Sequence, residues 1–257
     1  MINNNILKTE FRKKFDEVLY NNTSLRHLLY EIFVFGSAYI VGGYLRDIIN
    51  NKKSRDIDII VDLNHNDLLE IISKSKIEYI INRHNGIKLV LLDIEIDIWS
   101  IENNWAFKND LVKLNEDDKL NSIAKGCFYN YDALVINLHN FNFNIKYYRD
   151  FKKTNQLDIL QTTPSYKNLN PTIEANILRA FYLRKINNIS YSINTKKYLI
   201  NKIGYLKDKH GNPNIILLNT KSKYPKYDSV LNVLDIDIFI TELIIDNELN
   251  DQLFLNL

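Results

Sequence analysis

Two glycines in the first fifth of the chain are placed where they could bind a phosphate. Gly42 and Gly43 follow an apolar run at 38–41 that predicts a short strand, and they precede a stretch at 44–50 that predicts a helix. A glycine pair at such a turn lets backbone N–H groups approach an anion, and the helix N-terminus adds a positive dipole end. Arg46 would lie in the first helical turn, where its guanidinium could meet a phosphate oxygen.

Two carboxylates follow on the next predicted strand. Asp56 and Asp58 alternate with isoleucines, and the period of two puts both on one face, roughly 6.6 Å apart along the strand. Carboxylates at this spacing can share divalent ions, and Mg²⁺ binds a few carboxylates together with phosphate oxygens. Arg55, directly before the pair, could screen the carboxylates or contact a phosphate. A phosphate-binding turn beside a pair of metal-binding carboxylates is typical of enzymes that transfer phosphoryl or nucleotidyl groups.

The order and spacing of these residues resemble a known family. Gly-Gly-x-x-Arg-Asp at 42–47, followed by Asp-x-Asp at 56–58, is similar to the head domain of the class II CCA-adding enzymes and bacterial poly(A) polymerases, within the polymerase-β-like nucleotidyltransferase superfamily. The resemblance implies two Mg²⁺ ions at the aspartates and an NTP substrate. It also implies that the triphosphate contacts the first motif, at Gly42, Gly43, Arg46 and Asp47. The alternative is an ordinary turn followed by a solvent-facing strand.

The family's metal site needs a third carboxylate from a neighbouring strand. Residues 93–99 alternate strictly, which puts three isoleucines on one face and three acids on the other. Asp97 is our candidate because Ile-Asp-Ile resembles the family's short strand at this point in the chain, and Glu95 and Asp93 are its rivals. An acidic solvent-facing side would give the same pattern, although a sheet face with this many acids repels itself unless a cation is bound.

A second stretch, at 125–137, resembles the family motif Arg-Arg-Asp-Phe-Thr-Ile-Asn-Ala less closely. The Arg-Arg-Asp half falls on Gly126, Cys127 and Phe128, so its charged contacts to a nucleotide are absent. By position in the motif, Asn130 and Asp132 could still hydrogen-bond a ribose or a base. The alternative for both is the polar interior of a strand.

Two further stretches extend the resemblance. Residues 145–151 resemble the return strand of the head and the aspartate that starts the next helix, which makes Asp150 an N-cap or domain-junction residue. Residues 177–184 resemble the neck helix, in which an arginine faces the triphosphate in relatives. Arg179 is therefore a candidate for nucleotide binding, and a surface salt bridge is its alternative.

The composition fits a globular protein with a substantial core. The chain has 257 residues, of which 46% are hydrophobic, and a single cysteine that excludes an intramolecular disulfide. The five histidines lack zinc-ligand spacing, and no signal peptide or long apolar run is evident. We therefore expect a cytoplasmic protein.

Charge is distributed unevenly, although the net charge is only +2. The segment 196–226 has one acidic residue and eight lysines, Lys196, Lys197, Lys202, Lys207, Lys209, Lys221, Lys223 and Lys226. Residues 227–257, which follow this segment, contain no Lys or Arg and seven acids. The basic segment could hold a nucleic-acid backbone, or it could be a solvated helix face balanced by the acidic tail.

These observations predict an α+β fold with two domains. Residues 1–150 would form a nucleotidyltransferase head, a mixed β-sheet with flanking helices, and residues 151–257 a helical neck and C-terminal domain. The Glu-Asp-x-x-Arg motif that selects CTP and ATP in CCA-adding enzymes is absent, and their body and tail would need more chain than 190–257. CCA synthesis is therefore not assumed.

The favoured function is Mg²⁺-dependent transfer of NMP from an NTP to an acceptor hydroxyl, with an RNA 3′ end, such as that of tRNA, as acceptor. Asp56, Asp58 and Asp97 would be the catalytic residues. The alternatives are nucleotidylation of a protein or small molecule, as in toxins or phage defence, and a degenerate nucleotide-binding module.

Overall fold

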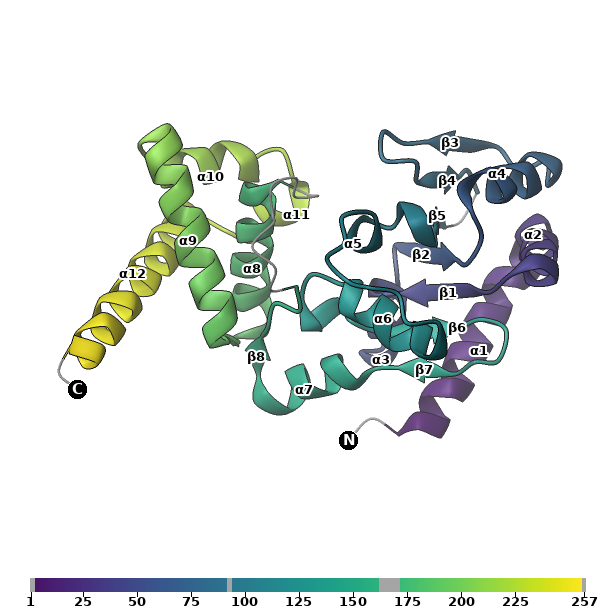
Figure 1. Ribbon diagram of the computed structural model, residues 1–257, viewed down its shortest axis with the longest axis horizontal. Helices are drawn as coiled ribbons and strands as arrows, with labels where there is room; N and C mark the ends of the chain where they lie inside the picture. The colour runs from purple at the N-terminus through teal and green to yellow at the C-terminus, as the bar shows by residue number, and fades with distance from the viewer. Residues whose placement is uncertain (1–2, 92–93, 162–171, 256–257) are drawn as a thin grey trace. The chain divides into compact units, whose positions relative to one another are not determined.

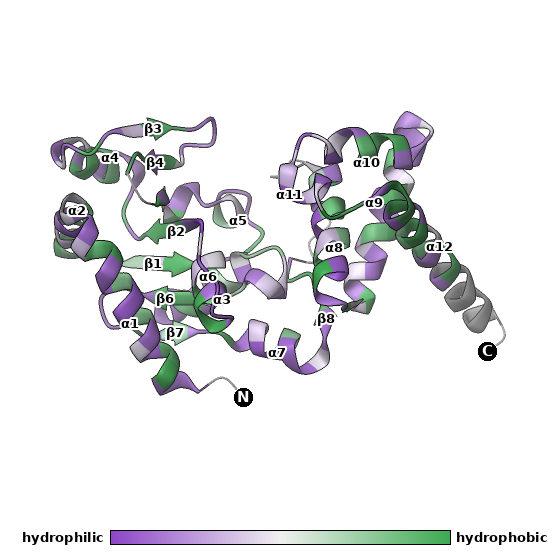
Figure 2. Ribbon diagram, turned by 180° about the vertical axis from the view of Figure 1, so that it is seen from behind, coloured by the Kyte–Doolittle hydropathy of each residue, from purple (hydrophilic) through white to green (hydrophobic). Residues whose placement is uncertain are grey.

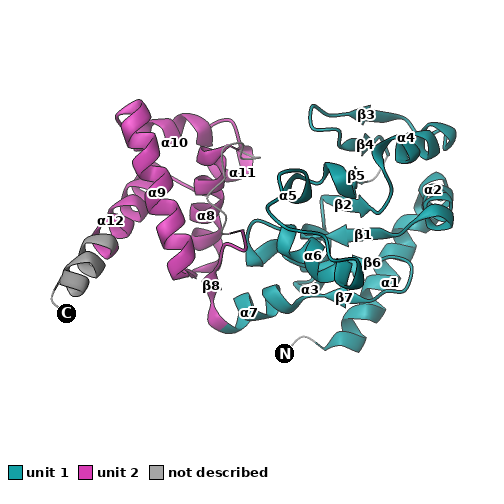
Figure 3. Cartoon of the chain, viewed as in Figure 1, with its two compact units in different colours: residues 1–153 teal, residues 154–257 magenta. Residues whose placement is uncertain are grey.

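The computed structural model describes residues 3–91, 94–161 and 172–255, and its contacts divide the chain into two compact units, 1–153 and 154–257 (Figure 3). Within the described part, the first unit is built on a seven-stranded sheet with the order β3-β4-β5-β2-β1-β6-β7 (Figure 1). Its strands are β1 Ala38–Val41, β2 Asp56–Val61, β3 Tyr79–Ile81, β4 Ile87–Leu89, β5 Glu95–Ser100, β6 Val135–Asn137 and β7 Phe143–Asn144. β2 and β5 pair in parallel, and the other neighbours pair antiparallel. The predicted mixed sheet is confirmed.

Isoleucines explain why the two central strands form and how they are oriented. Ile57 and Ile59 of β2, and Ile96 and Ile98 of β5, are completely buried. Because successive side chains of a strand point to opposite faces, this burial turns the intervening aspartates to the other face of the sheet. Figure 2 shows hydrophobic residues along the central strands.

Helices surround this sheet and supply the remaining core. They are α1 Asn4–Asn21, α2 Thr23–Phe35, α3 Gly43–Ile49, α4 His65–Lys74, α5 Trp105–Lys108, α6 Lys119–Gly126 and α7 Lys146–Thr154, with 3₁₀ turns η1 Ile101–Asn103, η2 Glu116–Asp118 and η3 Asn130–Asp132. The apolar stripe of α1 packs on α3, where the rings of Phe11 and Phe15 lie 6.1 and 6.4 Å from Tyr44. Asn3 caps α1 by accepting from two backbone N–H groups.

Two predictions about local structure are wrong. Residues 145–151 form no return strand, because α7 begins at Lys146 and Asp150 lies inside it rather than at its N-cap. The strand that pairs with β6 is the short β7 before it. Tyr148 and Phe151, three residues apart, are both buried, which is the spacing of a helix and not of a strand. Likewise, Asn130 and Asp132 lie on η3 and not in the interior of a strand.

The second unit is helical, as expected. It contains α8 Ile173–Asn187, α9 Ile193–His210, α10 Pro213–Lys221, α11 Pro225–Asp228 and α12 Val233–Leu255, with a two-stranded parallel sheet of β8 Gln156–Leu157 and β9 Ser190–Tyr191. Thr172 caps α8, and Phe181, Leu199 and Leu217 are completely buried. Across the described ranges of both units, no helix combines the length and apolarity needed to span a bilayer.

Candidate active site

The glycine turn connects β1 to α3, as the sequence predicts. Gly42 has a φ of 77° and a ψ of −118°, and its N–H donates to the carbonyl of Leu134 at 2.8 Å. A Cβ at Gly42 would lie 3.6 Å from the backbone oxygen of Asp132, so η3 packs closely over the turn. Only a glycine adopts this backbone conformation readily. Gly43 then begins α3, whose first turn has no side-chain cap within the described residues.

The sheet register places two of the candidate carboxylates beside this turn. Val41, the last residue of β1, pairs with Asp58 of β2, and Asp58 in turn pairs with Asp97 of β5. Paired residues of adjacent strands carry their side chains on the same face of a sheet. Gly42, Asp58 and Asp97 therefore lie at neighbouring positions of the adjacent strands β1, β2 and β5, with Gly42 directly after the end of β1. Asp56 lies two residues before Asp58, on the same face.

Basic side chains contact the acids of this face. The Arg55 guanidinium donates from Nε to Oδ2 of Asp56 at 3.0 Å, and Lys88 Nζ lies 2.9 Å from Glu95 Oε2. Lys88 also pairs with Asp97 in the β4–β5 register. Glu95 is thus held by a lysine, whereas Asp93, the other rival of Asp97, lies outside the described residues.

Electrostatics indicate that this face is short of positive charge. Burial raises the pKa of the Asp97 carboxyl above its usual range, and the carboxylates of Asp56 and Glu95 add to the effect. Lys88 and Arg55 act in the opposite direction without cancelling it. A bound cation would relieve this strain on the ionised carboxylate.

The donor set fits a divalent metal in its chemistry. Asp56, Asp58 and Asp97 offer carboxylate oxygens, the ligands that Mg²⁺ prefers, and they share one face. As the side chains stand, however, no three His, Cys, Asp or Glu residues in the described part of the chain are gathered closely enough to hold a metal ion. Asp56 is turned to Arg55 instead.

Arg46 and Asp132 form an ion pair that the sequence does not predict. Arg46 Nη1 donates to Asp132 Oδ1, and the guanidinium lies 4.6 Å from the ring centroid of Tyr131. Both charged side chains are mostly buried, at 18% and 14% exposure. Arg46 is therefore held over η3, on the glycine turn. The buried Asn130 belongs to the same 3₁₀ turn.

Asp47 supports the loop that leads into β2. It lies 3.6 Å from Arg46 and accepts a hydrogen bond from Ser54 Oγ at 3.2 Å. Ser54 also donates to the backbone oxygen of Asp56 at 3.1 Å. This chain of contacts connects α3 to the start of β2, so Asp47 has a bracing position. The sequence alone did not single out Ser54, although its place two residues before Asp56 could have indicated a role at the start of β2.

Two predicted nucleic-acid or nucleotide contacts lie in the second unit. Arg179 is half-buried on α8, and its role stays a prediction. The lysine-rich segment is partly neutralised, since Lys196 pairs with Asp246 and Lys221 with Asp228, each at 2.5 Å. Lys202, Lys209 and Lys226 lie over tyrosine rings. The expected balance between this segment and the acidic tail is thus partly present.

A family match covers the part of the chain that contains the glycine turn and all three aspartates. Residues 38–122 match the poly A polymerase head domain. This segment of the chain is similar to a poly A polymerase head domain. The predicted resemblance to the polymerase-β-like nucleotidyltransferases, and to class II CCA-adding enzymes in particular, is confirmed. A search of curated proteins found no match.

Solved structures extend the similarity beyond the poly A polymerase head domain. A CCA-adding enzyme with CTP has a TM-score of 0.60 at 21% identity, covering 86% of this chain and 50% of that one. The Thermotoga maritima CCA-adding enzyme complexed with tRNA scores 0.59 at 21%, with 85% and 49% covered. A tRNA nucleotidyltransferase complexed with a primer tRNA and an ATP analogue scores 0.55 at 18%, with 82% and 58% covered. At these identities the similarity shows the fold, and the chain spans about half the length of these structures.

Proposed function

We propose that this protein is a metal-dependent nucleotidyltransferase that moves NMP from an NTP to the 3′ hydroxyl of an RNA. The observation that carries the proposal is the β1–β2–β5 register, which sets the glycine turn, Asp58 and Asp97 side by side within a segment similar to a poly A polymerase head domain. Transfer forms a bond between the acceptor oxygen and the α-phosphorus. It breaks the bond from that phosphorus to the leaving pyrophosphate, and the hydroxyl proton passes to solvent.

The roles of this chain's residues follow from their positions. Backbone N–H groups at Gly42 and Gly43 would bind the triphosphate, because the turn lets a phosphate approach the main chain. Asp56, Asp58 and Asp97 would hold divalent metal, two Mg²⁺ ions in our proposal. When bound, such ions polarise phosphoryl oxygens and lower the pKa of the attacking hydroxyl. Arg55 would neutralise Asp56 while the metal is absent.

An RNA 3′ end, such as that of a tRNA, is the acceptor that the comparisons favour. The similar solved structures include CCA-adding enzymes determined with CTP, with ATP and with tRNA. None of these similarities supports a protein or small-molecule acceptor. A degenerate nucleotide-binding module is disfavoured because Asp58 and Asp97 are retained at paired positions of β2 and β5, where burial raises the pKa of the Asp97 carboxyl and a cation would stabilise its charged form.

The test is a transfer assay with each α-labelled NTP, Mg²⁺ and total cellular RNA, resolved on a denaturing gel. We expect wild-type protein to label RNA, and Asp58→Ala and Asp97→Ala to lose at least about 100-fold of that activity, as expected when groups that act on the transition state are removed. Chelation of the metal should have the same effect. Asp117→Asn is the matched control, since Asp117 is an exposed carboxylate of η2 away from these strands.

Two results would contradict the proposal. The first is labelled RNA that persists undiminished in the Asp58 variant, because the chemistry would then not depend on the paired strands. The second is labelled protein with unlabelled RNA in a co-expression lysate, because the acceptor would then be wrong. The four NTPs run in parallel also give the nucleotide preference, for which the sequence has no recognised template motif.

A further inference from the structure

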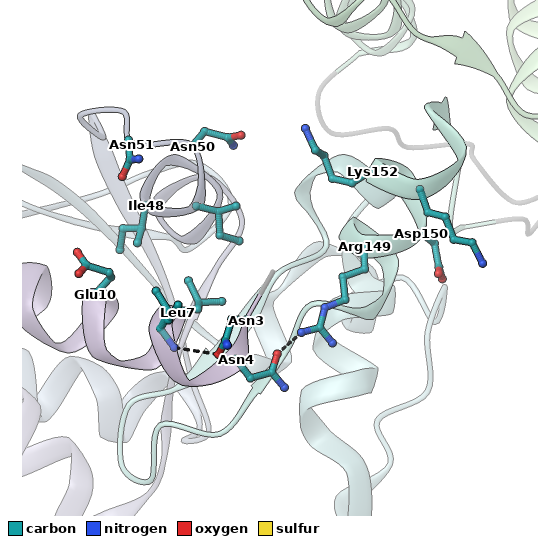
Figure 4. Close-up of a pocket in the computed structure, with 13 residues that line it drawn as sticks. Asn3, Asn4, Leu7, Glu10, Ile48, Asn50, Asn51, Arg149, Asp150 and Lys152 are labelled. Atoms are coloured by element: carbon teal, nitrogen blue, oxygen red, sulfur yellow. Dashed lines mark hydrogen bonds between the residues drawn. The ribbon is translucent and has the colours of Figure 1, made fainter. Parts of the chain in front are cut away.

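A groove on the head lies apart from the paired aspartates, between the start of α1, the end of α3 and α7 (Figure 4). Its volume is about 1110 Å³. Pockets that hold a single small molecule typically measure about 300–1,000 Å³. The groove is therefore large enough for a ligand longer than one mononucleotide.

The lining combines an apolar floor with a polar rim. Leu7 of α1 and Ile48 of α3 are buried beneath it. Four side-chain amides stand around them, Asn3, Asn4, Asn50 and Asn51. Asn3 Oδ1 is used in capping α1, Asn4 Oδ1 accepts from Arg149, and Asn50 Nδ2 donates within the head. A side-chain amide has two N–H donors and a carbonyl acceptor, so the remaining groups of the rim can hydrogen-bond base edges and sugar hydroxyls. An apolar floor of this kind accepts the flat face of a base or a ribose.

Positive charge comes from one helix. Arg149, Lys152 and Lys153 of α7 line the groove, against two acids, Glu10 and Asp150. Figure 4 shows the side chain of Arg149 reaching Asn4, to which it donates a hydrogen bond. Lys152 and Lys153 are both exposed. The excess positive charge favours an anionic ligand, and ammonium groups on a flexible stem suit phosphates.

The groove is connected to the candidate active site through α3. This helix begins at the glycine turn, ends at the groove, and rises about 10 Å over its seven residues. Asn50, on the groove rim, donates to the backbone oxygen of Arg46 at 2.7 Å and to Tyr148 Oη at 3.0 Å. After Asn50 in the sequence, the exposed Lys52 and Lys53 lie in the loop that precedes Asp56. A stacked nucleic-acid strand covers the same rise in about three nucleotides, at about 3.4 Å each.

We propose that this groove binds single-stranded RNA a few nucleotides upstream of the 3′ end that reacts. Lys152 and Lys153 contact phosphates, the asparagine amides contact bases and sugars, and the floor packs against a base or ribose. This assignment deepens the proposed function and rests on it for the identity of the acceptor. The groove's volume, above the usual range for a single small molecule, argues against a free mononucleotide as its ligand.

The first experiment measures binding of a fluorescent single-stranded RNA of about 12 nucleotides, a length that such grooves cover, to the full chain over a series of salt concentrations. Each phosphate contact contributes about 0.7 to the slope of log K against log salt, so Lys152→Gln/Lys153→Gln should lower the slope by about 1.4. The control is Lys125→Gln/Lys146→Gln, which removes two exposed lysines of the same unit, one of them from α7, that do not line the groove. Equal slopes in all three proteins would overturn the proposal.

A second experiment separates this proposal from the proposed function. NMP transfer to a dinucleotide, which is too short to reach the groove, should be unchanged in the Lys152/Lys153 variant, while KM for the longer RNA should rise about tenfold, as expected for two lost phosphate contacts. If the wild-type protein transfers no NMP, while the Lys152/Lys153 variant binds RNA more weakly than the wild type, the proposed function is wrong and the RNA-binding groove is supported. Normal transfer with unaltered KM in the variant would sink the groove alone. Displacement of the RNA by ATP in Asp58→Ala protein would also count against it.

Discussion

Gly42 adopts a φ of 77° and a ψ of −118°, a region that residues with a Cβ rarely occupy. We expect Gly42→Ala to lower the free energy of unfolding by about 1–3 kcal/mol and to reduce nucleotide transfer, because the turn must shift. Gly43→Ala is the matched control. Its Cβ would meet only the flexible Arg46 side chain, at 3.4 Å, so we expect a change within about 0.5 kcal/mol. Urea unfolding measures both, and equal losses would show that φ is not the cause.

The Arg46–Asp132 pair makes a second prediction at the residue scale. Both side chains are mostly buried, so removing either takes the shorter of the opposite-charge contacts away from a mostly buried group. We expect Arg46→Ala and Asp132→Ala each to cost about 2–4 kcal/mol in unfolding free energy, and the double variant to cost less than their sum by at least about 1 kcal/mol. A double-mutant cycle by chemical denaturation tests this. Additive losses would mean that the two residues act independently.

Individual residues show how far the sequence predicts the site. Strand periodicity alone assigns Asp56 and Asp58 to one face of β2. Asp97 is a candidate because of the family resemblance, and its pairing with Asp58 across β2 and β5 comes only from the sheet register. The Arg46–Asp132 pair could not be found in this way, since 86 residues separate its members. Local patterns contain no information about which distant side chain a guanidinium will meet. The roles given to these residues in catalysis stay predictions.

The β3–β4 hairpin is the element that covers the edge of β5. Its turn has Asn85 at a φ of 65°, and Gly86 packs against Trp99 of β5. A Cβ at Gly86 would lie 2.4 Å from the ring of Trp99, which is two residues after Asp97. We expect Gly86→Ala to cost about 1–3 kcal/mol through overpacking and to reduce transfer by displacing β5. Asn85→Gly, which also adopts a positive φ readily, should change neither stability nor activity measurably, and a thermal melt with a rate assay checks both.

Element boundaries were predictable where burial and local preference agree, and not where they conflict. Residues 145–151 have aromatic side chains that favour a strand locally, yet they form α7, because Tyr148 and Phe151 bury against the head at helical spacing. Tertiary packing overrides a weak β preference in such cases. The strictly alternating 95–99 had no such conflict, and β5 forms there.

At the scale of the whole chain, the uneven charge distribution is partly balanced by ion pairs inside the second unit. The C-terminal helix α12 has acids and no Lys or Arg. Three of these acids pair with cations of α8 and α9, in the pairs Asp235–Lys185, Glu242–Arg184 and Asp246–Lys196. Sequence alone left the tail as one of two possible partners for the lysines. Only the packing of α12 decides which cations are neutralised and which remain for other contacts.

This charge balance predicts a pH dependence of stability. Although burial opposes it, hydrogen bonding from the Asn232 backbone and from Lys185, at 2.6 Å, lowers the pKa of Asp235 below its ordinary value. A carboxyl with a lowered folded-state pKa stabilises the fold above its unfolded pKa of about 3.9, and that stability is lost as the pH falls further. Asp235→Asn should therefore cost about 1–2 kcal/mol at pH 7, and its difference from wild type should shrink below about pH 4.

The neighbouring Asp237 provides the control for this prediction. Asp237 accepts from the neutral amide of Asn214 rather than from a cation, so Asp237→Asn should lose less than the Asp235 variant at pH 7. Urea unfolding at several pH values between neutral and acid measures all three proteins. A difference between wild type and Asp235→Asn that stays constant into acid would show that the carboxylate charge does not hold α12 against α8. In that case the packing of apolar residues such as Phe181 against Phe239, whose rings lie 5.4 Å apart, would account for the contact.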